Sequence, residues 1–214
     1  MDIKKIKNYL YYNRIKIAAI VFAVGFIAVT FMQCSQRKET DLGIMYVGKA
    51  VVSEKLPGLA EKIAKANIIK DADKDGEITL NSKAIVIPHS KEKMIEQQVP
   101  EQIQVEIISG ENLLYILEKE TLISYAVDES FADITALTEK FDIPKQSCLS
   151  YENGSVYAIP AEGNALLKEL GIEEAGMYFA LRNYLPKDKD KPTIINAKKA
   201  LEYILERKNQ NEGK

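Results

Sequence analysis

Three aspartates alternate within one short acidic stretch, which reads Asp71-Ala-Asp-Lys-Asp-Gly-Glu77. Asp71, Asp73 and Asp75 match the first, third and fifth positions of the calcium loop of an EF-hand. Gly76 then permits the sharp bend of such a loop, and Glu77 offers a main-chain carbonyl. Because Ca²⁺ takes about six to eight oxygen ligands, alternate carboxylates in a tight turn suit it. The pattern predicts a calcium site formed by Asp71, Asp73, Asp75 and Glu77.

The second half of this motif is missing, which leaves an alternative open. The twelfth position should be a glutamate that binds the ion through both oxygens, but here it is Ser82. The residues after Gly76 read as a strand, whereas an EF-hand requires a helix there. Water would have to complete the coordination, with a weak affinity of about 10⁻⁴ to 10⁻³ M. The alternative is a plain Asp/Gly turn that leads from a helix into a strand.

The motifs of common catalytic and nucleotide-binding sites are absent from the sequence. The single histidine, His89, cannot supply a zinc cluster, and there is no His-Glu-x-x-His motif. There is neither a glycine-rich phosphate loop nor a Gly-x-Ser-x-Gly motif. Cys148 and the single, remote His89 are too little to indicate a nucleophile and its base. We expect a protein that is not an enzyme, and the net charge of −2 gives no electrostatic reason for nucleic-acid binding.

A long apolar run occupies residues 15–34, and it sets the expected location of the protein. From 17 to 32 it carries no charge, and Thr30 is its only polar side chain. At about 1.5 Å per residue, such a run forms a helix of roughly 27 Å, close to the hydrocarbon core of a bilayer. Lysine and arginine concentrate before the run, so the N-terminus is expected in the cytoplasm and the rest of the chain outside.

These features divide the chain into five expected parts. They are a cytoplasmic basic segment at 1–14, a transmembrane anchor at 15–34, a linker at 35–41, an extracytoplasmic α/β domain at 42–206 and a polar tail at 207–214.

Three alternatives to a retained anchor remain for the apolar run. A cleaved signal peptide normally ends in an Ala-x-Ala site, which this run lacks. A lipoprotein signal would end at Cys34, although Met32 and Gln33 before it are not the small residues such signals carry. A buried core helix is disfavoured by the basic flank and by the apolar character of the run on all sides.

Hydrophobic periodicity predicts a layered α/β domain with a mixed sheet after residue 41. Extended segments are expected at 42–48, 77–88, 113–117, 148–160 as a hairpin, and 177–185. Helices are expected at 53–66, 91–98, 101–109, 121–128, 166–170 and from 196 onward, with a connecting region at 133–146. Pro100 is expected to separate two helices, and Asn153-Gly154 suits a type I′ turn. Asn196 is expected to cap the last helix.

Four segments, in chain order, resemble those of the extracytoplasmic solute-binding proteins of ABC transporters. They are Glu106-Ile-Ile-Ser-Gly110, Leu113-Leu-Tyr-Ile-Leu117, Asp133-Ile-Thr-Ala-Leu137 and Asn153-Gly-Ser-Val-Tyr-Ala-Ile-Pro160. The sharpest element is Tyr157-Ala-Ile-Pro160 after a turn. The whole chain also resembles short membrane-anchored proteins of Gram-positive anaerobes that carry a degenerate type 2 solute-binding domain.

This resemblance implies a fold similar to type 2 periplasmic binding proteins and the binding of a small molecule or peptide. Full proteins of that class are much larger and have two lobes with a cleft, so this chain provides one lobe or two reduced ones. No ligand-binding residue is assigned from the sequence. Four tyrosines either stack on a ligand or fill the half-buried surface of the sheet: Tyr151, Tyr157, Tyr178 and Tyr184.

The expected partners are the lipid bilayer and a transporter or another protein of the cell envelope. Ca²⁺ is the only expected ion, and no cofactor is expected. The alternative function is a structural or protein-interaction module of the envelope that has no small ligand. A cleft lined with aromatic and polar side chains would favour solute binding, whereas an exposed apolar patch would favour the interaction module.

Overall fold

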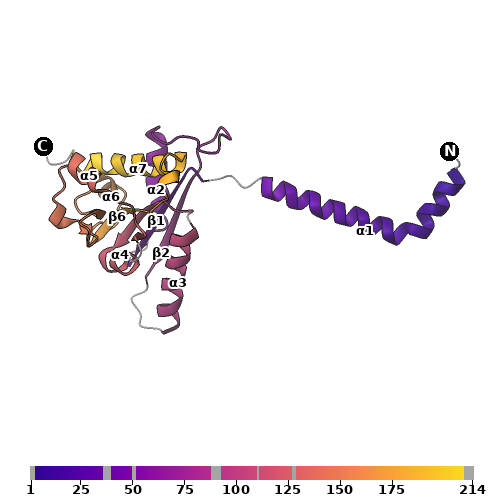
Figure 1. The fold of residues 1–214 in the computed structure, drawn as a ribbon, viewed down its shortest axis with the longest axis horizontal. Helices are drawn as coiled ribbons and strands as arrows, with labels where there is room; N and C mark the ends of the chain where they lie inside the picture. The colour runs from indigo at the N-terminus through magenta and orange to yellow at the C-terminus, as the bar shows by residue number, and fades with distance from the viewer. Residues whose placement is uncertain are drawn as a thin grey trace. The chain divides into compact units, whose positions relative to one another are not determined.

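The protein divides into two compact units, Met1–Lys38 and Glu39–Lys214. Its structure, a computed structural model, describes residues 3–35, 40–49, 52–87, 93–109, 111–126 and 129–209 (Figure 1). His89, which the sequence singled out, lies outside the described residues. Asp41, which the sequence placed in a linker, is buried within the second unit with 1 % of its surface exposed.

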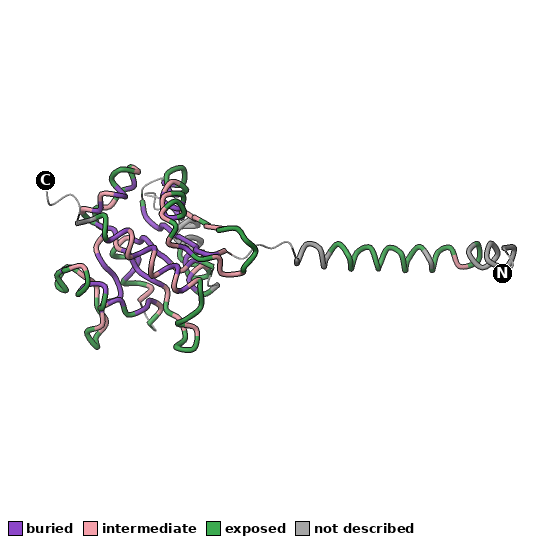
Figure 2. Tube along the Cα trace, turned by 90° about the horizontal axis from the view of Figure 1, so that it is seen from above, coloured by how far each residue is buried: buried purple, intermediate pink, exposed green. Residues whose placement is uncertain are grey.

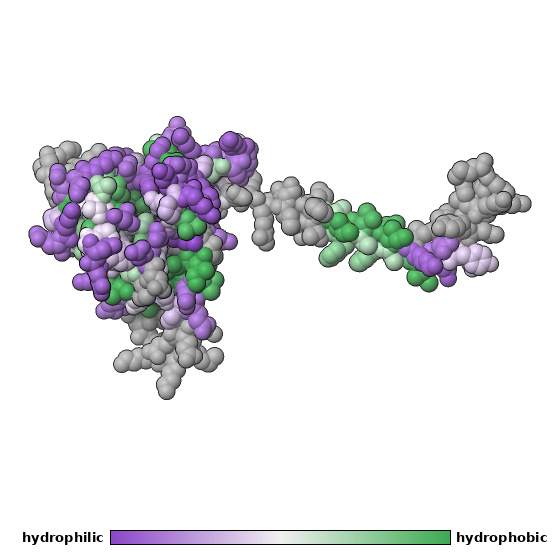
Figure 3. All heavy atoms as spheres, viewed as in Figure 1, coloured by the Kyte–Doolittle hydropathy of each residue, from purple (hydrophilic) through white to green (hydrophobic). Residues whose placement is uncertain are grey.

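The first unit is a single helix, α1 (Ile3–Ser35). Within it, Tyr11–Val29 has a mean hydropathy of 1.7 and is nowhere buried in the protein, so its length and composition suffice to cross a membrane. Figure 3 shows apolar side chains on the visible face of the middle of this helix. An N-terminal signal sequence has the same features, and the orientation of the chain in a membrane stays a prediction.

The second unit is built on one mixed sheet of six strands in the order β2-β1-β3-β6-β5-β4. β1 is parallel to β2 and β3, β6 is antiparallel to β3 and β5, and β4 is antiparallel to β5. This arrangement confirms the expected α/β class with a mixed sheet. The strands are β1 (Leu42–Gly48), β2 (Leu80–Val86), β3 (Leu114–Glu118), β4 (Leu149–Ser150), β5 (Val156–Pro160) and β6 (Met177–Leu181).

Helices cover both faces of this sheet (Figure 1). One face carries α2 (Leu56–Lys65), α5 (Thr135–Lys140), α6 (Ala165–Glu169) and α7 (Pro192–Asn209). The other face carries α3 (Lys93–Ser109) and α4 (Lys119–Tyr125). Two short 3-10 helices, η2 (Lys145–Ser147) and η3 (Pro186–Asp188), lie in the connections.

The central strands are buried on both sides because helices cover them on both sides. Ile44 and Tyr46 of β1 belong to the core of the α7 face, whereas Met45 and Val47 belong to the core of the α3 face. Successive side chains of a strand point to opposite faces, which explains why this strand is apolar throughout rather than alternating. The buried segments run through the centre of the unit in Figure 2.

Two predictions of irregular structure were wrong, one near Pro100 and one at 133–146. α3 continues through Pro100 as one helix, where the sequence predicted two. An interior proline removes its own N–H from the ladder and its ring crowds the carbonyl four residues earlier, so the helix is retained at a cost that tertiary packing of Ile103 and Ile107 offsets. The expected connecting region at 133–146 contains α5 and the 3-10 helix Lys145–Ser147.

The hairpin between β4 and β5 is present, but its turn is not type I′. Gly154 has a φ of 83°, and Asn153 is not among the residues with positive φ, which a type I′ turn would require. The N–H of Tyr151 bonds the carbonyl of Ser155, and the N–H of Gly154 bonds the carbonyl of Tyr151. Asn153 instead accepts the Ser155 N–H and hydroxyl at 2.9 and 2.7 Å, a local bond that favours right-handed backbone.

Asn196 does not cap α7, as the sequence predicted, but lies inside it and is fully buried. Its amide nitrogen donates to the carbonyls of Asp41 at 3.1 Å and Lys70 at 2.7 Å. Its amide oxygen accepts the N–H of Lys70 at 2.9 Å. One side chain therefore satisfies three main-chain groups from two segments that are distant in the sequence.

We expect Asn196→Ala to lower the free energy of unfolding by about 2–4 kcal/mol, because it leaves three main-chain groups at a buried position without partners. The measurement is urea unfolding of the full chain in detergent, followed by near-ultraviolet circular dichroism. Asn81→Ala on the exposed edge strand is the matched control and should change stability by less than about 0.5 kcal/mol. Equal effects of the two substitutions would contradict this role of Asn196.

Candidate functional site

The acidic loop lies between α2 and β2, and its own main chain binds its carboxylates. Asp71 accepts the N–H groups of Lys74 at 2.5 Å and Gly76 at 2.8 Å. Asp73 accepts the N–H of Asp75 at 3.1 Å, and Asp75 accepts that of Glu77 at 2.8 Å. Lys74 and Gly76 have positive φ angles of 62° and 91°. The aspartates thus stabilise a turn, which both the predicted calcium site and the alternative of a plain Asp/Gly turn require.

The loop is joined by an aspartate that sequence reasoning missed. Asp41 accepts the N–H groups of Ala72 at 2.6 Å and Thr79 at 2.7 Å, one on each carboxylate oxygen. One carboxylate oxygen from each of Asp41, Asp71 and Asp73 lies within 4.8 Å of the other two. Asp75 and Glu77, which the sequence included in the calcium site, are not part of this group.

Hydrogen bonds within the loop favour the ionised form of its first aspartate. The N–H of Gly76, and after it that of Lys74, holds the pKa of Asp71 below its ordinary value. The contribution of ionised Asp71 to the stability of the folded protein is therefore fully present at neutral pH, and it is lost as the pH falls through this lowered pKa.

A hollow of about 470 Å³ lies at the opposite edge of the sheet, where the parallel strands end. After β1 the chain turns to α2 on one face, and after β3 it enters α4 on the other face. The two connections diverge, so the sheet itself leaves a crevice between the carboxyl ends of these strands. β6 completes the wall because Met177, its first residue, pairs with Glu118 at the end of β3.

The lining of this hollow is charged and comes from three separate segments. It consists of Lys49, Glu118, Lys119, Glu120, Glu173, Ala175, Gly176 and Met177. Sequence reasoning did not find these residues, because no motif connects positions that only the strand pairing brings together.

Lys49 and Glu118 close one side of the hollow. The main-chain N–H of Lys49 donates to Glu118 Oε1 at 2.7 Å, and its ammonium lies 3.2 Å from Oε2. The N–H of Lys119 donates to the carbonyl of Gly176 at 3.3 Å, which joins the start of α4 to the segment before β6. Within the described part of the chain, Lys119, Glu120 and Glu173 form no ion pair, so charges of both signs face solvent in the hollow.

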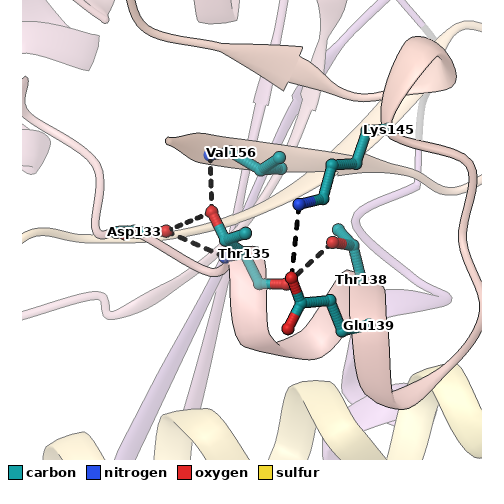
Figure 4. A network of polar contacts seen from close by, with 6 residues as sticks. All are labelled: Asp133, Thr135, Thr138, Glu139, Lys145 and Val156. Atoms are coloured by element: carbon teal, nitrogen blue, oxygen red, sulfur yellow. Dashed lines mark hydrogen bonds and ion pairs between the residues drawn. The ribbon is translucent and has the colours of Figure 1, made fainter. Parts of the chain in front are cut away.

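The segment Asp133-Ile-Thr-Ala-Leu137, which resembles a part of solute-binding proteins, supports β5 rather than the hollow. Asp133 accepts the N–H and hydroxyl of Thr135 at 2.8 and 2.6 Å, and Thr135 Oγ1 accepts the N–H of Val156 at 2.9 Å (Figure 4). The N–H of Ile134 donates to the carbonyl of Val156 at 2.8 Å. Two of the resembling segments are thus hydrogen-bonded to each other.

The tyrosines singled out in the sequence pack on the hydrophobic core: Tyr157 is buried and Tyr151 and Tyr178 are partly buried on the α3 face, and Tyr184 is partly buried on the α7 face. Tyr157 is 5 % exposed and lies between Tyr151 and Phe131, with ring centroids 4.4 and 6.2 Å away. The Tyr151 hydroxyl accepts the N–H of Phe131 at 3.1 Å and donates to its carbonyl at 2.9 Å. Tyr184 lies 4.8 Å from the ammonium of Lys198. Tyr151 and Tyr157 therefore stack on protein rings, in keeping with the alternative that they fill the surface of the sheet.

No protein-family model, no curated protein and no solved structure matches this chain. Membership of the solute-binding proteins therefore stays an expectation that rests on the resemblance.

Calcium binding also stays a prediction, and the structure sharpens its test. We expect millimolar Ca²⁺ to raise the melting temperature of the full chain, because the ion would offset the repulsion among Asp41, Asp71 and Asp73. Asp73→Asn should abolish the rise, whereas Asp75→Asn, outside the group of three, should retain most of it. The measurement is a melting curve with and without Ca²⁺, with Mg²⁺ as the ionic control. No Ca²⁺-dependent change in the parent chain would leave the plain turn as the correct interpretation.

Proposed function

We propose that this protein is a membrane-anchored extracytoplasmic domain that binds a small charged solute without catalysis. The proposed binding site is the hollow at the carboxyl ends of β1 and β3. The observation that carries the proposal is the position of this hollow, at the point where the connections after these strands leave for opposite faces. Open α/β sheets bind their ligands at such points, since the diverging connections leave a ready-made crevice.

The size and lining of the hollow support a small solute. Its volume of about 470 Å³ lies within the range of about 300–1,000 Å³ that is usual for small-molecule sites. Lys119 offers an ammonium, and Glu120 and Glu173 offer carboxylates. An ionic ligand can pair with these groups, whereas an apolar ligand would remove water from them without replacing its hydrogen bonds. A solute with both an amine and an acid group fits this lining best.

A serine, cysteine or histidine mechanism is not proposed for the hollow at the strand ends, whose lining is as follows. Its described residues are lysines, glutamates, alanine, glycine and methionine, and they include no serine, cysteine or histidine. Lys49 and Glu118 form an ion pair, and the main-chain N–H of Lys49 also donates to Glu118, so we expect these two residues to form a fixed side of the hollow.

The resemblance to solute-binding proteins agrees with this proposal, and it also suggests how the chain differs from that class. The described residues of the second unit form one sheet, whereas a full solute-binding protein closes two lobes around its ligand. A single lobe offers half of such a cleft, so the ligand would remain open to solvent on one side and bind more weakly.

A second candidate function is the interaction module of the cell envelope. It is favoured by three large apolar side chains on the helices of one face, Val105 at 62 %, Ile108 at 67 % and Ile123 at 52 % exposure. Val105 and Ile108 lie three residues apart on α3 and are neighbours on its surface, and adjoining exposed apolar side chains are typical of protein interfaces. A transporter or another envelope protein would be the partner, as the sequence predicted.

The binding proposal is tested by screening charged solutes against the full chain in nanodiscs. We expect an amino acid, dipeptide or diamine to raise the melting temperature, and Lys119→Met or Glu173→Gln to weaken its binding about tenfold, since each removes one charged contact. Lys187→Met and Glu206→Gln make the same chemical changes at distant exposed positions and should leave binding unchanged.

Binding by none of these solutes, or binding that both site variants retain, would contradict the proposed site. The interaction module would then be favoured if Val105→Ser with Ile108→Ser abolishes crosslinking to an envelope protein in cells.

The proposed location is tested by labelling cysteines in intact cells. In a chain with Cys34 and Cys148 replaced by alanine, Lys187→Cys should react with a membrane-impermeant maleimide, whereas Asn8→Cys should react only after lysis. Reaction of Lys187→Cys only after lysis would contradict an outside domain. Release of a shortened chain into the medium would instead support a cleaved signal peptide.

A further inference from the structure

A second hollow, of about 670 Å³, lies among three helices on the α7 face. It shares no residue with the hollow at the carboxyl ends of the strands. α2 contributes Lys62 and Lys65 to it, α6 contributes Glu169, and α7 contributes Tyr203 and Arg207. Ala66, Ala165 and Leu166 supply its apolar part. It is therefore a concave site with a few convergent polar groups, the usual form of a ligand pocket.

Its lysines are held only by ion pairs that a ligand can replace. The Lys62 ammonium lies 2.6 Å from Glu169, whose side chain is 65 % exposed. The Lys65 ammonium lies 2.6 Å from Glu61, and both of these side chains are more than half exposed. Exposed pairs of this kind contribute little net stability, because solvent screens them and ordering two long side chains costs entropy. An incoming anion can pair with the ammonium groups, and the carboxylates of the glutamates then become hydrated.

Arg207 is the cation of this hollow that has no acidic partner within the described part of the chain. Its guanidinium lies 5.1 Å from the centre of the Tyr203 ring, and its Nη2 donates to the Tyr203 hydroxyl at 3.3 Å. The remaining guanidinium N–H groups form a fork that matches two oxygens of one anion. The Tyr203 hydroxyl accepts from Arg207, so its own proton can be donated to a ligand oxygen.

The ends of α2 and α7 at this hollow carry the negative side of the helix dipole, so the attraction for an anion must come from the side chains. Lys62 and Lys65 lie in the last turn of α2, where the helix dipole is negative and lysines are favourable on structural grounds alone. Arg207 likewise lies in the last turn of α7, but the dipole preference does not explain why the last turns of two helices bring their cations to one hollow. The negative helix ends repel every anion in proportion to its charge, so binding depends on Lys62, Lys65 and Arg207, which attract a dianionic group more strongly than a monocarboxylate.

We infer that this hollow binds a phosphate monoester. A monoester carries about 1.5 to 2 negative charges at neutral pH and has three strong acceptor oxygens, enough for Lys62, Lys65 and Arg207 together. The volume exceeds what a phosphate alone would fill, and Leu166 with its neighbouring alanines contacts the organic part. The phosphate can belong to a free metabolite or to a lipid headgroup, since the recognising groups are the same.

The test is calorimetry of the full chain in nanodiscs of phosphatidylcholine, titrated with glycerol 3-phosphate. Binding should be measurable in the millimolar range or below, and it should weaken several-fold when the salt is raised from about 0.05 to 0.3 M. Neutral glycerol and acetate should give no heat. Nanodiscs that contain phosphatidic acid separate the two sources, because a headgroup in the hollow would compete with added glycerol 3-phosphate, whereas a site for free metabolites would not be affected.

Arg207→Met and Lys62→Met each remove one cation but keep its apolar stem, and each should weaken binding at least about tenfold. Lys198→Met, on the same helix but away from the hollow, should leave binding unchanged. Melting curves without ligand verify that all variants are folded. No heat with glycerol 3-phosphate, or equal affinity in the parent chain and Arg207→Met, would overturn the inference. Neither result affects the proposed solute site, whose residues are different.

Discussion

The second unit depends on a junction of two buried side chains, Asp41 and Asn196, at the start of β1. The carboxylate of Asp41 accepts N–H groups from Ala72 and Thr79, and its carbonyl accepts a bond from Asn196. Asn196 also binds both main-chain groups of Lys70. A buried charge or amide is stable only with such partners, so α7, the acidic loop and the start of β2 must meet at this point. β1 and β2 then pair in parallel from Leu42 and Leu80 onward.

The two ends of β1 consequently have different roles. Its amino end is closed by buried hydrogen bonds that fix the acidic loop, so a cation held there would act mainly on stability. Its carboxyl end opens into the hollow, because the connections after β1 and β3 leave toward opposite faces. The same parallel topology thus produces a rigid edge and an open edge, and the charged solute is proposed to bind at the open one.

The two hollows differ in how their charges are compensated. At the strand ends, Glu118 satisfies both the main-chain N–H and the ammonium of Lys49, and the remaining charges are of both signs. Among the helices, the described lining has three cations and one glutamate, and within the described residues Arg207 is held by a tyrosine rather than by an acid. This difference in electrostatic balance is the reason why we propose different ligands, an amine-bearing acid for one and a phosphate for the other.

Local sequence patterns determined much of this protein. The apolar run within α1, the buried strands at Leu42–Gly48 and Leu114–Glu118 and the α/β class follow from hydrophobic periodicity, which depends on neighbours in the chain. The Asp/Gly turn and the position of the hairpin follow from residues that bond their own main chain. Tertiary structure decided the rest. Pro100 stays helical because packing holds α3, and Asn196 is a buried bridge because Asp41 and Lys70 lie beside it. Lys49, Glu118 and Arg207 border hollows only because strand order and helix packing join segments that are far apart in the sequence, and no local pattern encodes that distance.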